Sequence, residues 1–280
     1  MGPRKEHNVG IARIADRLSW IAGALAAIAA AVGLFVPGIY RDVPFWAQQA
    51  QGTDVATLFG AVPILLVGLW ATRAGSLIGR LAAIAGILYL IYNYAIFAFA
   101  VEVNPLLAVY IAILSLSVWS FALMLFAGGT LRTSLPGLPR RTTAGVLITV
   151  ALVFALLWMS QIAGATLTGQ TPVDLERTEL PTNPVWTLDL AFFLPLCIVA
   201  AVGVLRRAEA AGVFALPMLI WLFLTSVGIV AAFVFASLAG DPLAIVPLVL
   251  VSTIGIVTGA LAGVVAVRAR RPTASEPIAS

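Results

Sequence analysis

An apolar segment, LIGRLAAIAGILYLIYNYAIFAFAV (Leu77–Val101), decides the fold of this chain. A helix rising ~1.5 Å per residue over this length crosses a hydrocarbon core of ~30 Å. Seven further segments have a similar length and a similarly apolar composition. They are Leu18–Val36, Val55–Ala71, Pro105–Phe126, Ala144–Leu167, Trp186–Leu205, Val213–Leu238 and Pro242–Val267. The sequence therefore predicts an all-α, polytopic membrane helix bundle with eight transmembrane helices.

The charged residues are few and are divided unequally between the two sides of the predicted bundle. Only 10% of residues are charged, against roughly 25% in soluble domains. Of the 16 basic residues, all except Arg41 and Arg177 lie on one side. The positive-inside rule makes that side, with both termini, cytoplasmic. Together with an arginine- and alanine-rich composition, this pattern indicates a bacterial cytoplasmic (inner) membrane protein rather than a nucleic-acid-binding protein.

The chain divides into two sets of four helices. We expect cytoplasmic tails at 1–17 and 268–280, helical halves at 18–127 and 144–267, and a Gly-, Pro- and Arg-containing linker at 128–143. Similar features recur in the second helix of each half and the loop before it, and they suggest a parallel 4+4 repeat. The matched residues are Pro44, Trp46, Asp54 and Pro63 in one half, and Pro184, Trp186, Asp189 and Pro195 in the other.

A stripe of small residues in the last helix predicts close helix packing. Gly255, Gly259 and Gly263 recur every four residues, which allows another backbone to approach closely. That backbone belongs either to a neighbouring helix of the same bundle or to a partner helix, including that of a second copy in a homodimer.

Asp, Glu, Lys, Arg and His are absent from the middle third of every predicted helix. This pattern argues against proton pumps, voltage sensors and retinal proteins, which keep such groups at depth. The sequence also lacks a phosphate-binding loop, a His-Glu-x-x-His motif and a Gly-x-Ser-x-Gly motif. We therefore predict no catalytic residue and no cofactor, and the pattern leaves open whether a metal binds.

Uncharged polar residues gather instead in the outer half of the predicted bundle. Because a buried amide in lipid needs hydrogen-bond partners, Asn93 and Gln161 should face protein or water. One interpretation is hydrogen bonding between helices. The other is that Asn93, Tyr89 and Gln161 line the floor of an outward-open cavity. The mouth of that cavity would be ringed by three carboxylates, Asp54, Glu102 and Asp189.

Several short motifs resemble those of a widespread group of uncharacterised bacterial multipass membrane proteins. The motifs are Gly38–Asp42, Asp54–Leu58, Tyr92–Ala95, Asn104–Leu106, Ser115–Ser117, Leu180–Pro184 and Leu188–Leu190. The resemblance covers most of the chain and implies no activity.

Three classes of function are consistent with these patterns. The first is a protein that binds or transports a small solute or cation through the outward-open cavity. The second is a non-enzymatic membrane partner subunit or sensor. The third is an interfacial lipid-modifying enzyme that would use Asp54, Glu102 or Asp189, although their spacing specifies no reaction. The lipid bilayer is the one partner that all three require.

Overall fold

The computed structural model describes residues 3–127, 138–208, 213–242 and 245–269, and these residues form helices and loops without a strand. The helices are α1 (Pro3–Phe35), α2 (Pro44–Ala56), η1 (Thr57–Ala61), α3 (Val62–Arg73), α4 (Leu77–Ala100), α5 (Leu107–Phe126), α6 (Arg140–Thr168), α7 (Val173–Thr178), α8 (Pro184–Leu188), η2 (Asp189–Phe193), α9 (Leu194–Leu205), α11 (Ala215–Leu238) and α12 (Ile245–Ala269). Within the described residues, eight helical spans are long and apolar enough to cross a membrane. The predicted all-α bundle is confirmed, and the chain is a multipass integral membrane protein.

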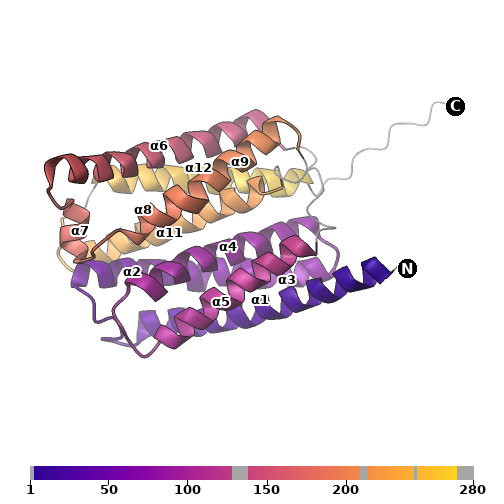
Figure 1. Cartoon of the computed structure of the whole chain (residues 1–280), viewed down its shortest axis with the longest axis horizontal. Helices are drawn as coiled ribbons and strands as arrows, with labels where there is room; N and C mark the ends of the chain where they lie inside the picture. The colour runs from indigo at the N-terminus through magenta and orange to yellow at the C-terminus, as the bar shows by residue number, and fades with distance from the viewer. Residues whose placement is uncertain (1–2, 128–137, 209–212, 243–244, 270–280) are drawn as a thin grey trace.

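The bundle has two layers that correspond to the two halves of the chain (Figure 1). One layer contains α1 to α5 and the other contains α6 to α12. Helix α11 joins the layers, because it packs against both α2 and α4. Helix α1 begins and α12 ends at the same end of the bundle, which we call the terminal end; α7 lies at the opposite, loop end (Figure 1). Most of the predicted linker, residues 128–137, and most of the C-terminal tail lie outside the described residues.

Two spans contain a short π-helical segment just before a proline. Proline has no backbone N–H and its ring clashes with the carbonyl four residues earlier, so an ordinary α-helical turn cannot form there. In both spans the turn widens: the N–H of Val62 bonds to the carbonyl of Thr57, and that of Leu194 bonds to the carbonyl of Asp189. Pro63 and Pro195 then lie in the first turn of the next α-helical segments, which begin at Val62 and Leu194. The two spans therefore share one local distortion with one sequence cause.

The helix starts expected at Leu18 and Val55 were placed too late. Helix α1 begins at Pro3, and the second span begins at Pro44, where a proline occupies the first turn and needs no N–H partner. Hydropathy marks only the part of a helix that is apolar. The added turns carry polar side chains such as Gln48, which is buried against protein. As a result Asp54, expected at a helix start, lies inside a continuous helical span.

Small residues let neighbouring helices approach closely, as predicted. A methyl group at Gly255 would lie 2.9 Å from Cβ of Ser226, and one at Gly259 would lie 2.8 Å from the ring of Phe223, both on α11. These two glycines therefore serve packing within the bundle. Gly263 has open space around the position of a Cβ atom.

The two halves approach each other closely between α2 and α11. A methyl group at Gly52 would overlap the backbone of α11 at Gly228 and Ala232. The main chains of the two helices therefore touch at this point.

Candidate functional site

Asn93 lies in the centre of a polar contact between α4 and the second span. Its side chain is 1% exposed, which confirms the prediction that it points into the bundle. Asn93 Nδ2 donates a hydrogen bond to Thr57 Oγ1 over 3.3 Å. One turn away, the hydroxyl of Tyr89 donates to the carbonyl oxygen of Thr53 over 3.2 Å. The spacing of four residues on α4 thus matches the spacing of four on the facing helix.

A cavity of about 80 Å³ lies beside Asn93, where α2 and α4 of one half meet α8 and α11 of the other. Its polar walls come from side chains of Gln49, Thr53, Asn93 and Thr225, and the rest is mainly aromatic and aliphatic. Thr225 Oγ1 is buried and has no hydrogen-bond partner among the described residues. The full lining is Trp46, Gln49, Ala50, Thr53, Tyr89, Tyr92, Asn93, Ile96, Phe97, Val101, Val185, Thr225 and Ile229. The space is sufficient for several water molecules or a small solute.

Asp54 is buried on the opposite face of the second span. It is 2% exposed, and Oδ2 accepts a hydrogen bond from the hydroxyl of Tyr40. Burial, and then the neighbouring carboxylate, raise the pKa of Tyr40, so its hydroxyl keeps the proton that it donates. Gly33 of α1 makes room for this pair, because a methyl group there would overlap Oδ2 of Asp54 and lie 2.5 Å from the hydroxyl oxygen of Tyr40.

Asp189, in the second half, is buried between α6 and Tyr92 of α4. It begins η2 and is 6% exposed. The indole N–H of Trp158 on α6 donates to Oδ2 of Asp189 over 2.8 Å. Oδ1 is buried without a hydrogen-bond partner among the described residues. This carboxylate therefore anchors η2 to α6.

Glu102 and Gln161 are not among the residues that line the cavity. Glu102 is exposed in the loop after α4, and its backbone N–H donates to Oδ1 of Asp42 over 2.8 Å. Burial raises the pKa of the Asp42 carboxyl, and the hydrogen bond from Glu102 opposes that effect. Gln161 is partly exposed on α6 and is not among the cavity residues.

The six predicted site residues therefore do not form one cavity. Tyr89 and Asn93 line it, but Gln161, Asp54, Glu102 and Asp189 do not. The structure does not bring the three carboxylates together around its mouth, because Asp54 and Asp189 are each engaged by an aromatic donor inside the protein and Glu102 is exposed in the loop after α4.

Sequence reasoning missed Thr53, Thr57 and Thr225. The i, i+4 spacing of Thr53 and Thr57 repeats that of Tyr89 and Asn93. That signal becomes visible only when the second helix is started at Pro44, because Thr53 otherwise falls in a loop.

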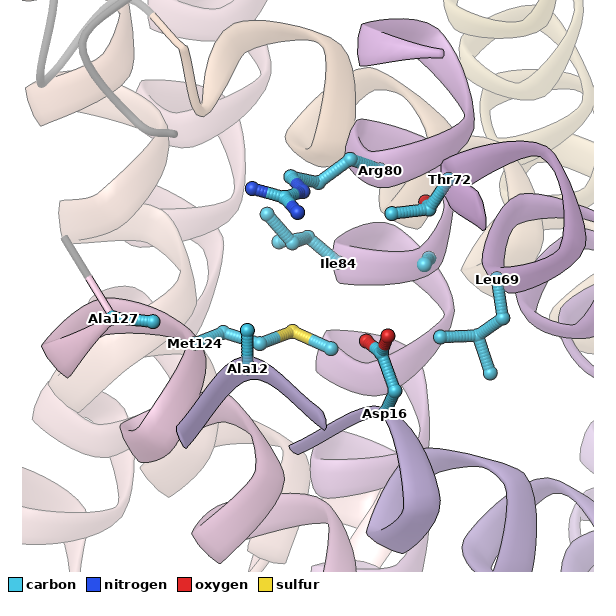
Figure 2. Close-up of a pocket in the computed structure, with 9 residues that line it drawn as sticks. Ala12, Asp16, Leu69, Thr72, Arg80, Ile84, Met124 and Ala127 are labelled. Atoms are coloured by element: carbon cyan, nitrogen blue, oxygen red, sulfur yellow. The ribbon is translucent and has the colours of Figure 1, made fainter. Parts of the chain in front are cut away.

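A second polar pocket lies at the terminal end. Asp16 of α1 and Arg80 of α4 point into it from opposite sides, with Thr72 of α3 at its edge (Figure 2). Its volume is about 30 Å³, enough for water but small for a solute. The expected tail 1–17 had placed Asp16 outside the bundle. Because α1 extends back to Pro3, Asp16 instead lies in a helix and shares a pocket with Arg80 of α4.

The chain matches no known family model, no curated protein and no solved structure. Among the described residues, no group of three or more His, Cys, Asp or Glu side chains is placed to hold a metal ion. The chemistry of this protein must therefore be inferred from the candidate site itself.

Proposed function

We propose that this integral membrane protein binds a small polar solute or monovalent cation in the cavity beside Asn93, and moves it across the membrane without catalysing a reaction. The observation that supports this most is the position of that cavity. It lies where α2 and α4 of the first half meet α11 of the second. Transporters built from two halves place their substrate at such a junction, because movement of one half against the other can then expose it to either side.

The lining supports the chemical class of the ligand. It contains amide and hydroxyl groups and aromatic rings but no charged residue. An anion would find no cationic partner there. An uncharged polar solute can hydrogen-bond with Asn93, Thr53 and Thr225, and a monovalent cation can be held by their oxygen atoms and by aromatic faces.

The proposal places the terminal end in the cytoplasm of a bacterial cell, by the positive-inside rule. The cavity would then lie in the outer part of the bundle. A reporter that is active only in the cytoplasm, fused to the C-terminus, should be active. An inactive reporter on a fully expressed protein would reject this orientation.

Flux measurements in proteoliposomes test the function. The probes are Na⁺, K⁺ and methylammonium as cations, and urea and glycerol as uncharged solutes. We expect wild-type protein to raise the flux of at least one probe, and Asn93→Leu to reduce that flux at least tenfold. Ser117→Ala is the matched control, since Ser117 is also fully buried but lies on α5 away from the cavity. Unchanged flux in folded Asn93→Leu would reject the proposal.

Thiol labelling separates a solvated cavity from a packed contact. The only native cysteine, Cys197, is fully buried and is replaced by alanine for this experiment. Asn93→Cys should then react with a small membrane-impermeant thiol reagent added outside, whereas Ser117→Cys should not. Equal, negligible labelling of both would leave Asn93 with a role in helix packing alone.

A further inference from the structure

Asp189 is a buried carboxylate of which only one oxygen has a partner. It lies inside the apolar span Pro184–Leu205 and is 6% exposed. Oδ2 accepts the indole N–H of Trp158, but Oδ1 is buried and accepts no hydrogen bond from a described residue. The contact that anchors η2 to α6 therefore uses one oxygen and leaves the other unpaired.

The neighbours of Asp189 in the described part of the chain are uncharged. The one ion pair there joins Arg177 to Asp241. The titratable groups that face Asp189 from other helices are Tyr92 of α4 and Cys197 of α9. An ionised carboxylate inside a membrane-spanning segment is costly without a cationic partner. A proton removes that charge and, unlike a metal ion or a water molecule, needs no space beside the buried Oδ1.

Tyr92 connects this carboxylate to the cavity beside Asn93. It interacts with Asp189 and also lines the cavity. Its ring packs against Phe193 of η2 and Trp221 of α11, with ring-centroid distances of 4.9 and 5.2 Å. Because these contacts hold the ring, the hydroxyl hydrogen is the part of Tyr92 that can change direction.

The protonation of Asp189 decides which way that hydroxyl donates. An ionised carboxylate only accepts hydrogen bonds, so it attracts the O–H of Tyr92. A protonated carboxyl group can instead donate to the oxygen of Tyr92, and the O–H of Tyr92 is then free to donate to a molecule in the cavity. In that state the site is uncharged and has gained a donor, which suits an uncharged solute with an acceptor oxygen.

We propose that Asp189 binds a proton that is transported together with an uncharged solute in the cavity, and that Tyr92 is the positioning residue that links the two. The inference rests on the proposed transport function, and it narrows the ligand from a solute or cation to a solute. By thermodynamic linkage, the proton then strengthens solute binding by the same factor as the solute strengthens proton binding.

Uptake into proteoliposomes under a proton gradient tests the coupling, with urea and glycerol as probes. An outside more acidic than the inside by about one pH unit should raise uptake by the wild type about threefold or more, and a protonophore should remove the increase. Asp189→Asn should not respond to the gradient. Glu102→Gln is the matched control, because Glu102 is also a carboxylate but is exposed in the loop after α4.

Infrared difference spectroscopy between acidic and alkaline pH detects the proton without transport. The wild type should show a carboxylic-acid carbonyl band that Asp189→Asn lacks and Glu102→Gln retains. Tyr92→Phe should move the midpoint of this band by about one pH unit, because the ionised carboxylate loses a donor. Tyr110→Phe on α5, another buried tyrosine, should leave the midpoint unchanged.

The outcomes separate this inference from the proposed function. Uptake of urea or glycerol that ignores the gradient, or a response that Asp189→Asn retains, would overturn the coupling and leave transport intact. An unchanged infrared band in Asp189→Asn would overturn the proton site whether or not a probe is transported. Uptake of Na⁺ or K⁺ that external acid slows would also reject the proposal, because the proton would then exchange for a cation. Absence of flux for every probe would instead reject the transport function itself.

Discussion

The two proline-interrupted spans have the same local distortion but use it differently. In the first span the widened turn begins at Thr57, and in the second it begins at Asp189, each six residues before the proline. Thr57 accepts a hydrogen bond from Asn93 next to the cavity. Asp189 accepts one from Trp158 and is held against α6. The same backbone geometry therefore supports a neutral polar site in one half and a structural anchor in the other.

This comparison also changes how the two halves are matched. The sequence pattern paired Asp54 with Asp189. Measured from the π-helical segments and the prolines, the residue equivalent to Asp189 is Thr57, one turn beyond Asp54. A duplication of the halves stays a prediction.

The largest expected effect comes from breaking the close approach of α11 to the first span. Gly52→Ala should lower the free energy of unfolding by ~3 kcal/mol, because its methyl group would overlap the backbone of α11, which cannot move aside. Gly60→Ala is the matched control in the same span. Its methyl group would meet only the end of the Leu224 side chain, so we expect less than ~1 kcal/mol. Thermal or chemical unfolding in detergent measures both, and equal effects would contradict the backbone contact.

The next largest effect concerns the buried carboxylate of the first span. Tyr40→Phe removes the hydroxyl that donates to Asp54 and should cost ~1 to 3 kcal/mol of stability. The double variant Tyr40→Phe with Asp54→Leu should recover part of that loss, because no unpaired carboxylate remains buried. If the double variant loses as much free energy of unfolding as the two single variants lose together, the two side chains are not coupled.

A smaller effect is expected from the polar contact that distinguishes the first span. Thr57→Val should cost ~1 kcal/mol, since it leaves the amide of Asn93 without its partner. Asn93→Leu should cost a similar amount. Combining the two should cost less than their sum, and a double-mutant cycle measured by chemical unfolding determines the difference. Strict additivity would show that this hydrogen bond contributes nothing.

The smallest effect is expected at the surface, where α7 contacts both halves. Arg177 lies over the ring of Phe45 in the first half and forms an ion pair with Asp241 in the second, with an N–O distance of 2.7 Å. Both charged side chains are about 40% exposed. Arg177→Gln should therefore cost under ~1 kcal/mol, and the difference from wild type should shrink as salt is added. A larger loss that is independent of salt would mean that packing against Phe45 dominates.

The spans were predictable from the sequence because length and hydropathy are local properties of the chain. The burial of Asn93 was predictable for a related reason: an amide in an otherwise apolar segment has few routes to hydrogen bonds except through protein or water. The residues at which the helices start were harder to predict. The first turns of α2 contain Gln48 and Gln49, which look like loop residues until the protein around them is known.

The arrangement of the carboxylates could not be predicted from the sequence alone. Which donor reaches Asp54 or Asp189 depends on how distant segments pack, and Trp158 lies 31 residues from Asp189. Composition indicates that a buried carboxylate needs a partner, but it does not identify one. An aromatic donor inside the bundle and a charged rim facing water satisfy the same requirement.

The contact at Gly52 has a mechanical consequence. Two main chains in direct contact can rotate against each other, but they cannot be pressed closer together. We therefore expect a movement of one half against the other to pivot at this point, near the cavity beside Asn93. Such a pivot moves the adjacent residues least and the distant terminal end most. A small rotation at Gly52 would thus leave the cavity walls nearly in place while it changes the separation of α3 and α12 at that distant end.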